Sequence, residues 1–276
     1  MKIRAASMGA SVVKGVKRLF NNGTVFVTKR HGINWYLDLD EGIDFAIYLL
    51  GRFENSTYEA YAKTVKPGAK VIDIGANIGA HTLPLATLVG DSGHVYAFEP
   101  TQTAFNKLQK NLSLNPELVK RVSLVQGMVV SSPSFELPDS IYASWPLHHN
   151  DQAHKLHLGV ACTTTGAVSL TLDQIVQKFS IQQIDLIKLD VDGFELEVLR
   201  GATNTLDKMA PPILMELAPY TMEEKGYDAA EAVHILTKYG YEFYGLDGKS
   251  LSTGDLMSWL KKPGFSVNIL AKTTRM

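Results

Sequence analysis

The stretch Val71-Ile72-Asp73-Ile74-Gly75-Ala76-Asn77-Ile78-Gly79-Ala80 decides the fold. Its first four residues form a short, mostly apolar run of strand length. Gly75 and Gly79 then mark a tight turn into a helix, and the first N–H groups of a helix have no partners within it. A strand, a glycine turn and a helix in this order predict the first unit of a doubly wound α/β sheet, with a ligand next to the turn.

Two features of this turn bear on the ligand. A dinucleotide fingerprint reads G-x-G-x-x-G/A, and Gly75 and Ala80 fit it, but Asn77 replaces the glycine that lets a pyrophosphate approach the backbone. Asp73 would also repel a pyrophosphate. A ligand with an adenosine half and a cationic amino-acid half suits the turn better, because a carboxylate accepts hydrogen bonds from an ammonium group. Taken alone, the glycines are equally typical of a structural turn.

Glu99 ends the next predicted strand, 24 residues after Gly75. An acid at this place accepts hydrogen bonds from both ribose hydroxyls in proteins that bind NAD or S-adenosylmethionine. The glycines, Asp73 and Glu99 on two consecutive strands therefore favour an adenosine-containing ligand over a purely structural turn.

Strand-length apolar runs alternate with helical patterns from residue 70 onward, which predicts a parallel sheet. The predicted strands are 71–74, 95–98, 122–125, 184–189 and 213–217. Thr101 stands where a helix N-cap is expected. A helix over 228–239 precedes two more strands, 241–244 and 265–270, which we expect to form an antiparallel hairpin through a Gly-rich connection.

Two regions fall outside this alternation. Residues 133–168 are rich in Ser, Pro, His and Thr, and they are predicted to be a functional insertion or lid. Residues 1–60 are predicted to be a basic arm with an accessory segment, which leaves 61–276 as the main α/β domain.

The composition is that of a globular protein. The chain has 276 residues, 45% of them hydrophobic, and a mean hydropathy of −0.01. Collagen-like, disordered and membrane-spanning classes are excluded on this basis. Cys162 is the only cysteine, and Lys14, Lys17 and Arg18 interrupt any secretory signal. We therefore expect no internal disulfide and a cytoplasmic location.

The charge is unevenly distributed. Residues 1–37 hold seven Lys and Arg and no acid, whereas the remainder holds 20 basic and 28 acidic residues, a net charge of −8. Apolar side chains over 8–20 recur at helical spacing between basic ones, which predicts a basic amphipathic helix. We favour docking on this chain's own body or on a second subunit, as in a homodimer, over peripheral docking on an anionic membrane.

Six strings resemble, in order and spacing, the FkbM family of S-adenosylmethionine-dependent methyltransferases. They are VIDIGANIGAHT (71–82), GHVYAFEP (93–100), KLQKNLSLN (107–115), SLTLDQI (169–175), DLIKLDVDGFELEVLRGA (185–202) and PILMEL (212–217). LDLDEGIDFAIYLLGRFE (37–54) also resembles a segment that precedes this domain in FkbM-like proteins of glycan biosynthesis. The resemblance implies O-methylation and a class I methyltransferase fold, Rossmann-like, with a seven-stranded, mostly parallel sheet and an antiparallel C-terminal hairpin.

The resemblance also implies which residues bind the cofactor. Those near the methionine end and the sugar edge would be Asp73, Gly75, Ala76, Asn77 and Gly79. Glu99 would hold the ribose, and Gln126, Gly127 and Met128 would face the adenine. Asp190 would lie near the methyl group and the acceptor. The family usually has glutamate where Asp192 stands.

Methyl transfer from a sulfonium depends chiefly on aligning the acceptor oxygen with the methyl group. A hydroxyl acceptor also needs a base within hydrogen-bond reach. Asp190 is the first candidate, because an open α/β sheet binds ligands at the carboxyl ends of its strands. Its alternative role is the N-cap of the helix that follows. His154 is the second candidate, in an insertion that also holds His148, His149 and His157.

Four acids follow predicted strands near this point, namely Asp190, Asp192, Glu195 and Glu216. Their oxygens are ligands that Mg²⁺ accepts, so Mg²⁺ is an alternative, although we favour structural roles for these acids and expect no metal. The insertion histidines have neither Cys partners nor i, i+4 spacing, so a structural zinc site is not expected.

The sequence therefore predicts O-methylation of a sugar, glycan or natural-product intermediate. A nucleic-acid methyltransferase is an alternative suggested by the basic arm. However, Leu189-Asp190-Val191-Asp192-Gly193 lacks the Asn/Asp-Pro-Pro-aromatic signature of enzymes that methylate base amino groups, and the acidic body would repel phosphates, so we expect no nucleic-acid partner. A catalytically silent adenosyl-binding scaffold is the other alternative.

Overall fold

A computed structural model describes residues 23–148, 150–155 and 157–273. Its centre is an eight-stranded sheet in the order β13-β12-β14-β11-β10-β3-β4-β5. The strands of this sheet are β3 (Lys70–Ile74), β4 (His94–Phe98), β5 (Val122–Val125), β10 (Leu186–Leu189), β11 (Ile213–Leu217), β12 (Tyr241–Gly245), β13 (Ser250–Leu251) and β14 (Val267–Thr273). The five strands predicted to be parallel pair in parallel register, so the doubly wound α/β class is confirmed.

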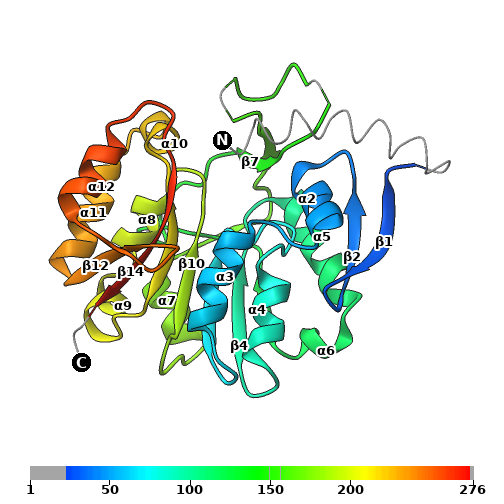
Figure 1. Ribbon diagram of the computed structural model, residues 1–276, viewed down its shortest axis with the longest axis horizontal. Coiled ribbons are helices and arrows are strands. Elements are labelled where there is room, and N and C mark those ends of the chain that lie inside the picture. The colour runs from blue at the N-terminus through cyan, green and yellow to red at the C-terminus, as the bar shows by residue number, and fades with distance from the viewer. Residues whose placement is uncertain (1–22, 149, 156, 274–276) are drawn as a thin grey trace.

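Helices cover both faces of this sheet (Figure 1). They are α4 (Thr82–Val89), α5 (Gln102–Ser113), α6 (Pro116–Val119), α7 (Leu172–Lys178), α8 (Glu195–Arg200), α9 (Thr203–Lys208), α10 (Pro219–Glu224), α11 (Ala229–Lys238) and α12 (Thr253–Leu260). Val71 of β3 packs in a cluster with Leu83 of α4, whereas Ile72 packs in another with Leu196 of α8. Because adjacent strand residues face opposite sides, a strand buried on both faces is a continuous apolar run.

The C-terminal strands form the expected antiparallel pair. Strand β14 lies between β11 and β12 and is antiparallel to both. The connection between β12 and β14 differs from the Gly-rich loop that we predicted, because it contains β13 and α12. Ser252 starts α12 by accepting a 3.0 Å hydrogen bond from the Asp255 N–H, a capping interaction that the sequence reading missed. Strand β13 adds a two-residue eighth strand to the seven expected.

The accessory segment is an antiparallel hairpin followed by two helices. These elements are β1 (Val25–Arg30), β2 (Ile33–Asp38), α2 (Gly42–Leu50) and α3 (Asn55–Thr64). Two buried amides, Asn111 of α5 and Asn115 at the N-cap of α6, bind the outer edge of β2. Asn111 Oδ1 accepts from the Tyr36 N–H at 2.7 Å, and Asn115 Oδ1 accepts from the Asn34 N–H at 2.8 Å. Side chains thus replace a third strand and fix the hairpin to the sheet domain. Helix α3 crosses residue 60, where we placed a domain boundary.

Replacing Asn111 with alanine is expected to lower the free energy of unfolding by about 1–3 kcal/mol, because two buried backbone groups lose their partners. Besides binding the Tyr36 N–H, Asn111 donates to the Ile78 carbonyl at 2.9 Å. Asn106 lies exposed on the same helix, and Asn106→Ala is expected to cost less than about 0.5 kcal/mol. Urea denaturation of both variants measures the difference, and equal losses would contradict the role given to Asn111.

The insertion over 133–168 contains an antiparallel pair, β7 (Ser140–Ser144) and β8 (Val160–Thr163). At its base, β6 (Gly127–Val129) pairs in parallel with β9 (Val168–Leu170). The insertion is joined to the accessory segment by backbone hydrogen bonds, from Gly42 N–H to Trp145 O at 2.9 Å and from Leu147 N–H to Asp40 O at 2.7 Å. Figure 1 shows it, in green, next to α2.

The predicted basic helix over 8–20 lies outside the described residues, so its docking partner stays a prediction. Within the part of the chain that is described, no helix has both the length and the apolar character needed to cross a membrane.

Candidate active site at the carboxyl edge of the sheet

The glycine turn is wedged between two neighbouring strands. The N–H groups of Gly75 and Ala76 both donate to Phe98 O of β4, at 3.0 and 2.9 Å. Gly75 has a φ of +82°, and a Cβ placed there would lie 1.8 Å from the Asp190 carbonyl oxygen, which follows β10. Only glycine permits this approach together with this backbone conformation.

Glu99 lies beside the turn with only 3% of its surface exposed. One carboxylate oxygen accepts from the Asn77 N–H at 2.9 Å, and the other accepts from the N–H and the hydroxyl of Thr101. Burial raises the pKa of Glu99, and these hydrogen bonds oppose that shift. Thr101 occupies the predicted N-cap position of α5, but its hydroxyl binds Glu99 and makes no cap bond.

Asn77 links the turn to the insertion. Its φ is +48°, and its side-chain oxygen accepts from the Ile78 N–H at 2.8 Å. Its side-chain nitrogen donates to the Ala143 carbonyl of β7 at 3.1 Å. Where a dinucleotide fingerprint has glycine, this chain therefore has a residue that ties the turn to β7.

Hydrogen bonds to Glu41 of the accessory segment also hold the insertion in place. The Glu41 carboxylate accepts from the Ser144 hydroxyl at 2.9 and 3.0 Å and from the Trp145 N–H at 3.0 Å. The accessory segment, the insertion and the glycine turn consequently meet at one edge of the sheet. Trp145 follows β7 directly.

A buried lysine joins two of the predicted site residues. Lys188 Nζ lies 3.2 Å from Asp190 Oδ2 and 3.9 Å from Asp73 Oδ1, and the Lys188 side chain is 5% exposed. Burial favours the neutral amine, but the carboxylates of Asp190, Asp73 and Glu54, together with the hydrogen bond to Asp190, outweigh it and raise the pKa of Lys188. Asp73 has no exposed surface, and its Oδ2 accepts from the Thr82 hydroxyl at 2.6 Å. Whether Asp73 receives the ammonium group of a ligand stays a prediction.

Asp190 does not cap the following helix. The N-cap of α8 is Phe194, and no side chain binds there. The Asp190 side chain is 24% exposed, so it is the partly open carboxylate of the pair that Lys188 joins.

Two of the four acids that we considered for Mg²⁺, Asp190 and Glu195, have different neighbours. The Glu195 carboxylate turns back to the Val191 and Gly193 N–H groups, both at 3.1 Å. Burial raises the pKa of Glu195 to about 7. Glu195 therefore stabilises the turn that carries Asp192, whose φ is +48°, and the absence of a metal stays a prediction.

His154 lies in a separate cluster of the insertion and α10. Its Nε2 is 3.0 Å from Glu224 Oε1, and its ring stacks on His157 at 4.0 Å. The three side chains bring ligand atoms within 4.8 Å of one another. The Nδ1 atoms of the two rings accept backbone N–H groups, of His157 at 3.4 Å and of Gly159 at 3.1 Å, an arrangement that favours the Nε2–H tautomer of each neutral ring. Burial, followed by His154 and Lys225, lowers the pKa of His157 to about 4.

The predicted adenine-facing residues follow β5. Gln126 Nε2 donates to Thr165 O at 2.9 Å, and Gly127 begins β6. Met128 is 3% exposed and packs with Val130 and Phe194. Their contact with an adenine stays a prediction.

Three residues behind the glycine turn were not predicted from the sequence: His81, Tyr61 and Lys188. His81 lies 3.4 Å from the Tyr61 hydroxyl and 3.7 Å from Glu54. Burial and the nearby Asp73 raise the pKa of Tyr61 well above its ordinary value. Lys188 did carry a signal, since a charge within the buried run Leu186–Leu189 needs a partner.

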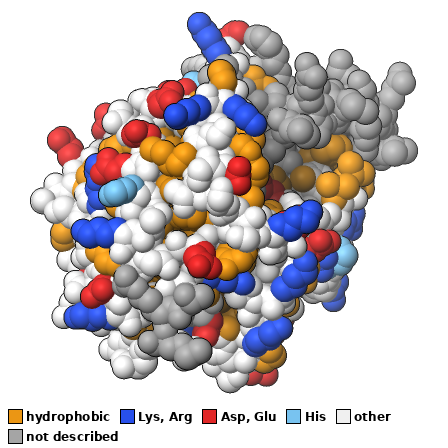
Figure 2. Space-filling view, turned by 60° about the vertical axis from the view of Figure 1, so that its left-hand side comes forward, with side chains coloured by type: hydrophobic (Ala, Val, Ile, Leu, Met, Phe, Trp, Pro, Cys, Tyr) orange, Lys and Arg blue, Asp and Glu red, His pale blue; other side chains and the backbone are white. Residues whose placement is uncertain are grey.

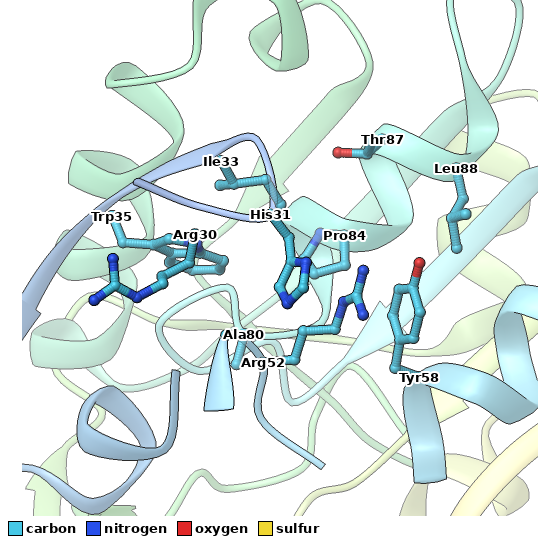
Figure 3. A pocket seen from close by; sticks show the side chains of 11 residues that line it. Arg30, His31, Ile33, Trp35, Arg52, Tyr58, Ala80, Pro84, Thr87 and Leu88 are labelled. Carbon is cyan, nitrogen blue, oxygen red and sulfur yellow. The ribbon is translucent and has the colours of Figure 1, made fainter. Parts of the chain in front are cut away.

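Two cavities lie away from this edge. One of about 480 Å³ is at the opposite edge of the sheet, lined by Pro67, Lys70 and Gln183 among others. The other, of about 40 Å³, lies between the β1–β2 turn and α4 (Figure 3). Neither is lined by the predicted cofactor residues.

The sequence profile of the methyltransferase FkbM domain matches residues 73–243, more than half of the chain. The chain belongs to the FkbM family. The matched region runs from Asp73 in β3 to Phe243 in β12, so the FkbM domain contains the glycine turn, Glu99 and Asp190. Its class I methyltransferase fold is the one that the sheet order describes.

Two relatives of this chain have methyltransferase names. The hexuronic acid methyltransferase AglP of Haloferax volcanii is 30% identical over 140 residues, which cover 50% of this chain and 51% of AglP. The methyltransferase sdnD of Sordaria araneosa is 26% identical over 192 residues, covering 57% and 73%. The match thus spans about half the length of AglP. Among solved structures, a putative rRNA-methylase from Clostridium thermocellum is 13% identical with a TM-score of 0.48, covering 80% of this chain and 96% of that one.

The residues at this edge fit an adenosyl sulfonium. Asp73, Glu99 and Asp190 carry three carboxylates against the single cation of Lys188, so the site has a net negative charge that suits a cationic ligand. Each Glu99 oxygen has two lone-pair sites, and among the described residues Oε2 accepts only the Asn77 N–H, which leaves capacity for a ribose hydroxyl.

Proposed function

We propose that this chain is an S-adenosylmethionine-dependent O-methyltransferase that acts on a sugar, glycan or natural-product intermediate. The observation that carries the proposal is Asp190, a partly exposed carboxylate beside the glycine turn, at the edge where open α/β sheets bind ligands. The name of AglP, a hexuronic acid methyltransferase, favours a sugar among these acceptors.

The glycine turn and Glu99 would hold the cofactor, with Glu99 on the ribose and the turn against the methionine end. When bound, S-adenosylmethionine supplies an electrophilic methyl group. The insertion, tied to Asn77 by the bond to Ala143, would cover this edge and limit the access of water.

Asp190 would accept the proton of the acceptor hydroxyl. Lys188 holds its Oδ2 at 3.2 Å, so the proton would pass to Oδ1. A base in this position raises the nucleophilicity of the hydroxyl as the methyl group approaches. His154 is the second candidate base.

Nucleic acid is not the acceptor that we propose. Basic and acidic side chains are interspersed over the face in Figure 2, which does not have the single-sign surface that phosphate binding favours.

Saturable binding of S-adenosylmethionine by calorimetry is the first test, and its absence would refute the proposal. Transfer of a labelled methyl group to a panel of free and nucleotide-linked sugars, including hexuronic acids, is the second test. Transfer to RNA in place of sugars would favour the nucleic-acid alternative. Cofactor binding without transfer to any acceptor would favour the silent scaffold.

Replacing Asp190 with asparagine is expected to lower kcat by about 10²- to 10⁴-fold, because the amide keeps the size of the side chain but cannot take the proton. Cofactor affinity is expected to change by less than about tenfold, since the ribose and turn contacts remain. Asp207→Asn on α9, an exposed acid, is the matched control with unchanged activity. If His154→Gln loses activity and Asp190→Asn does not, the base lies in the insertion.

A further inference from the structure

The 40 Å³ cavity beside the β1–β2 turn is lined by side chains other than those of the candidate active site. It is enclosed by the hairpin turn, the residues before α3 and one side of α4 (Figure 3). One water needs about 10–15 Å³ of such a cavity, so this volume has room for about three waters or one small anionic group.

The side chains around it are rich in hydrogen-bond donors and poor in acceptors. Three are basic, namely Arg30, His31 and Arg52, and none of the residues that line the cavity is an acid. Tyr58 lines the same cavity. A partly enclosed cavity with this set of donors favours an oxyanion over a neutral or cationic ligand.

The basic groups are held in place by their neighbours. The Arg52 guanidinium stacks on the Tyr58 ring, 3.8 Å from its centroid. The His31 ring lies against Gly51, where a Cβ would be 2.3 Å from its Nε2. In Figure 3, the His31 ring lies between Arg30 on one side and Arg52 with Tyr58 on the other.

Arg30 contributes mainly its positive charge to the cavity, because some of its N–H groups are already hydrogen-bonded. Its Nε donates to the Tyr48 carbonyl at 2.8 Å, and its Nη1 donates to the Thr28 hydroxyl at 2.9 Å. These bonds keep its positive charge at the rim without using Arg52 or His31.

A buried donor at the same cavity has no acceptor. Trp35 lines the cavity and is 2% exposed, and its indole N–H has no hydrogen-bond partner among the described residues. Buried N–H groups almost always have an acceptor, so one without it needs an explanation. Because Trp35 lines the cavity, this N–H is counted among the donors that a ligand there would meet.

We propose that this cavity is an oxyanion site, which takes the phosphate or carboxylate group of a ligand on Arg52, His31 and Trp35. Phosphate and carboxylate share the chemistry that these donors recognise. The site belongs to the accessory segment and α4, and binding there does not require methyl transfer.

The test is NMR of the ¹⁵N-labelled indole groups of the full chain. The chain has three tryptophans, Trp35, Trp145 and Trp259, and Trp35→Phe assigns the resonance of interest. Inorganic phosphate and acetate are titrated separately, with ionic strength held constant by chloride. We expect a saturable shift of the Trp35 resonance, with a Kd on the order of 1 mM, and no shift of the Trp259 resonance.

Arg52→Gln is expected to weaken this binding by about tenfold or more, because a charge-assisted hydrogen bond is lost. Lys63→Gln, which removes an exposed cation of α3 outside the cavity, is the matched control and leaves it unchanged. His31→Asn is a second variant in case Arg52→Gln fails to fold, since asparagine tolerates the φ of +46° at this position.

The titrations separate the two ligand sources. A shift with phosphate alone assigns the site to phosphorylated ligands, and a shift with acetate alone assigns it to carboxylates. No shift of the Trp35 resonance with either anion, or a shift of equal affinity in Arg52→Gln and His31→Asn, would overturn the proposal. Calorimetry with S-adenosylmethionine tests the proposed function separately.

Discussion

Replacing Lys188 with methionine is expected to lower the free energy of unfolding by about 3–5 kcal/mol, because removal of one partner leaves buried charge without compensation. Asp73 has no exposed surface and has its only described cation in Lys188, whose Nζ is 3.9 Å from its Oδ1. Asp190 can turn towards water, whereas Asp73 cannot. Most of the expected loss therefore arises at Asp73.

Chemical denaturation at neutral pH measures this loss. Lys70→Met is the matched control, because the Lys70 ammonium group is exposed and binds only the Ser92 carbonyl among the described residues, and a change below about 0.5 kcal/mol is expected. The double variant Asp73→Asn with Lys188→Met removes both charges and is expected to recover part of the loss. A loss below about 1 kcal/mol in Lys188→Met would show that the ion pairs are dispensable.

Replacing Gly75 with alanine is expected to lower methyl transfer by about 100-fold or more, since displacement of a site by about 1 Å can have that effect. The added Cβ would lie 1.8 Å from the Asp190 carbonyl oxygen. Because both the turn and the strand end that carries Asp190 must move apart, cofactor affinity is expected to fall with activity.

Gly226 offers a matched control for this variant. Its φ of +78° resembles that of Gly75, but a Cβ there would have no atom within 4 Å. Gly226→Ala therefore has only the conformational cost of a positive φ, about 1 kcal/mol. If Gly75→Ala loses more activity than Gly226→Ala, the excess loss measures the effect of the close approach between Gly75 and the Asp190 carbonyl oxygen. Equal activity in both variants would contradict that effect.

Local patterns were enough to predict the sheet. The mostly apolar runs Val71–Ile74 and Ile213–Leu217 lie in β3 and β11, because strands covered on both faces consist largely of apolar residues. Helix α11 begins after Asp228, which accepts from the Ala230 N–H, close to where the sequence predicted its start. These signals are local, so they can be read without the fold.

The site was predicted only in part. Glu99 and the glycine turn lie together as expected, because both follow neighbouring parallel strands. The link from Asn77 to Ala143 and the ion pair between Lys188 and Asp73 join residues 66 and 115 positions apart. Neither contact has a local pattern, so neither could be placed from the sequence.

By itself, the sequence determined the parallel sheet, the turn at Gly75 and the family, since each depends on residue order along short segments. Tertiary structure alone decided what surrounds the turn. It placed Lys188 between two acids, turned Thr101 from a helix cap into a partner of Glu99, and brought the insertion and accessory segment to one edge. The reason is physical: a buried polar group must find its partner in space, and its partner's distance along the chain does not affect the energy of that contact.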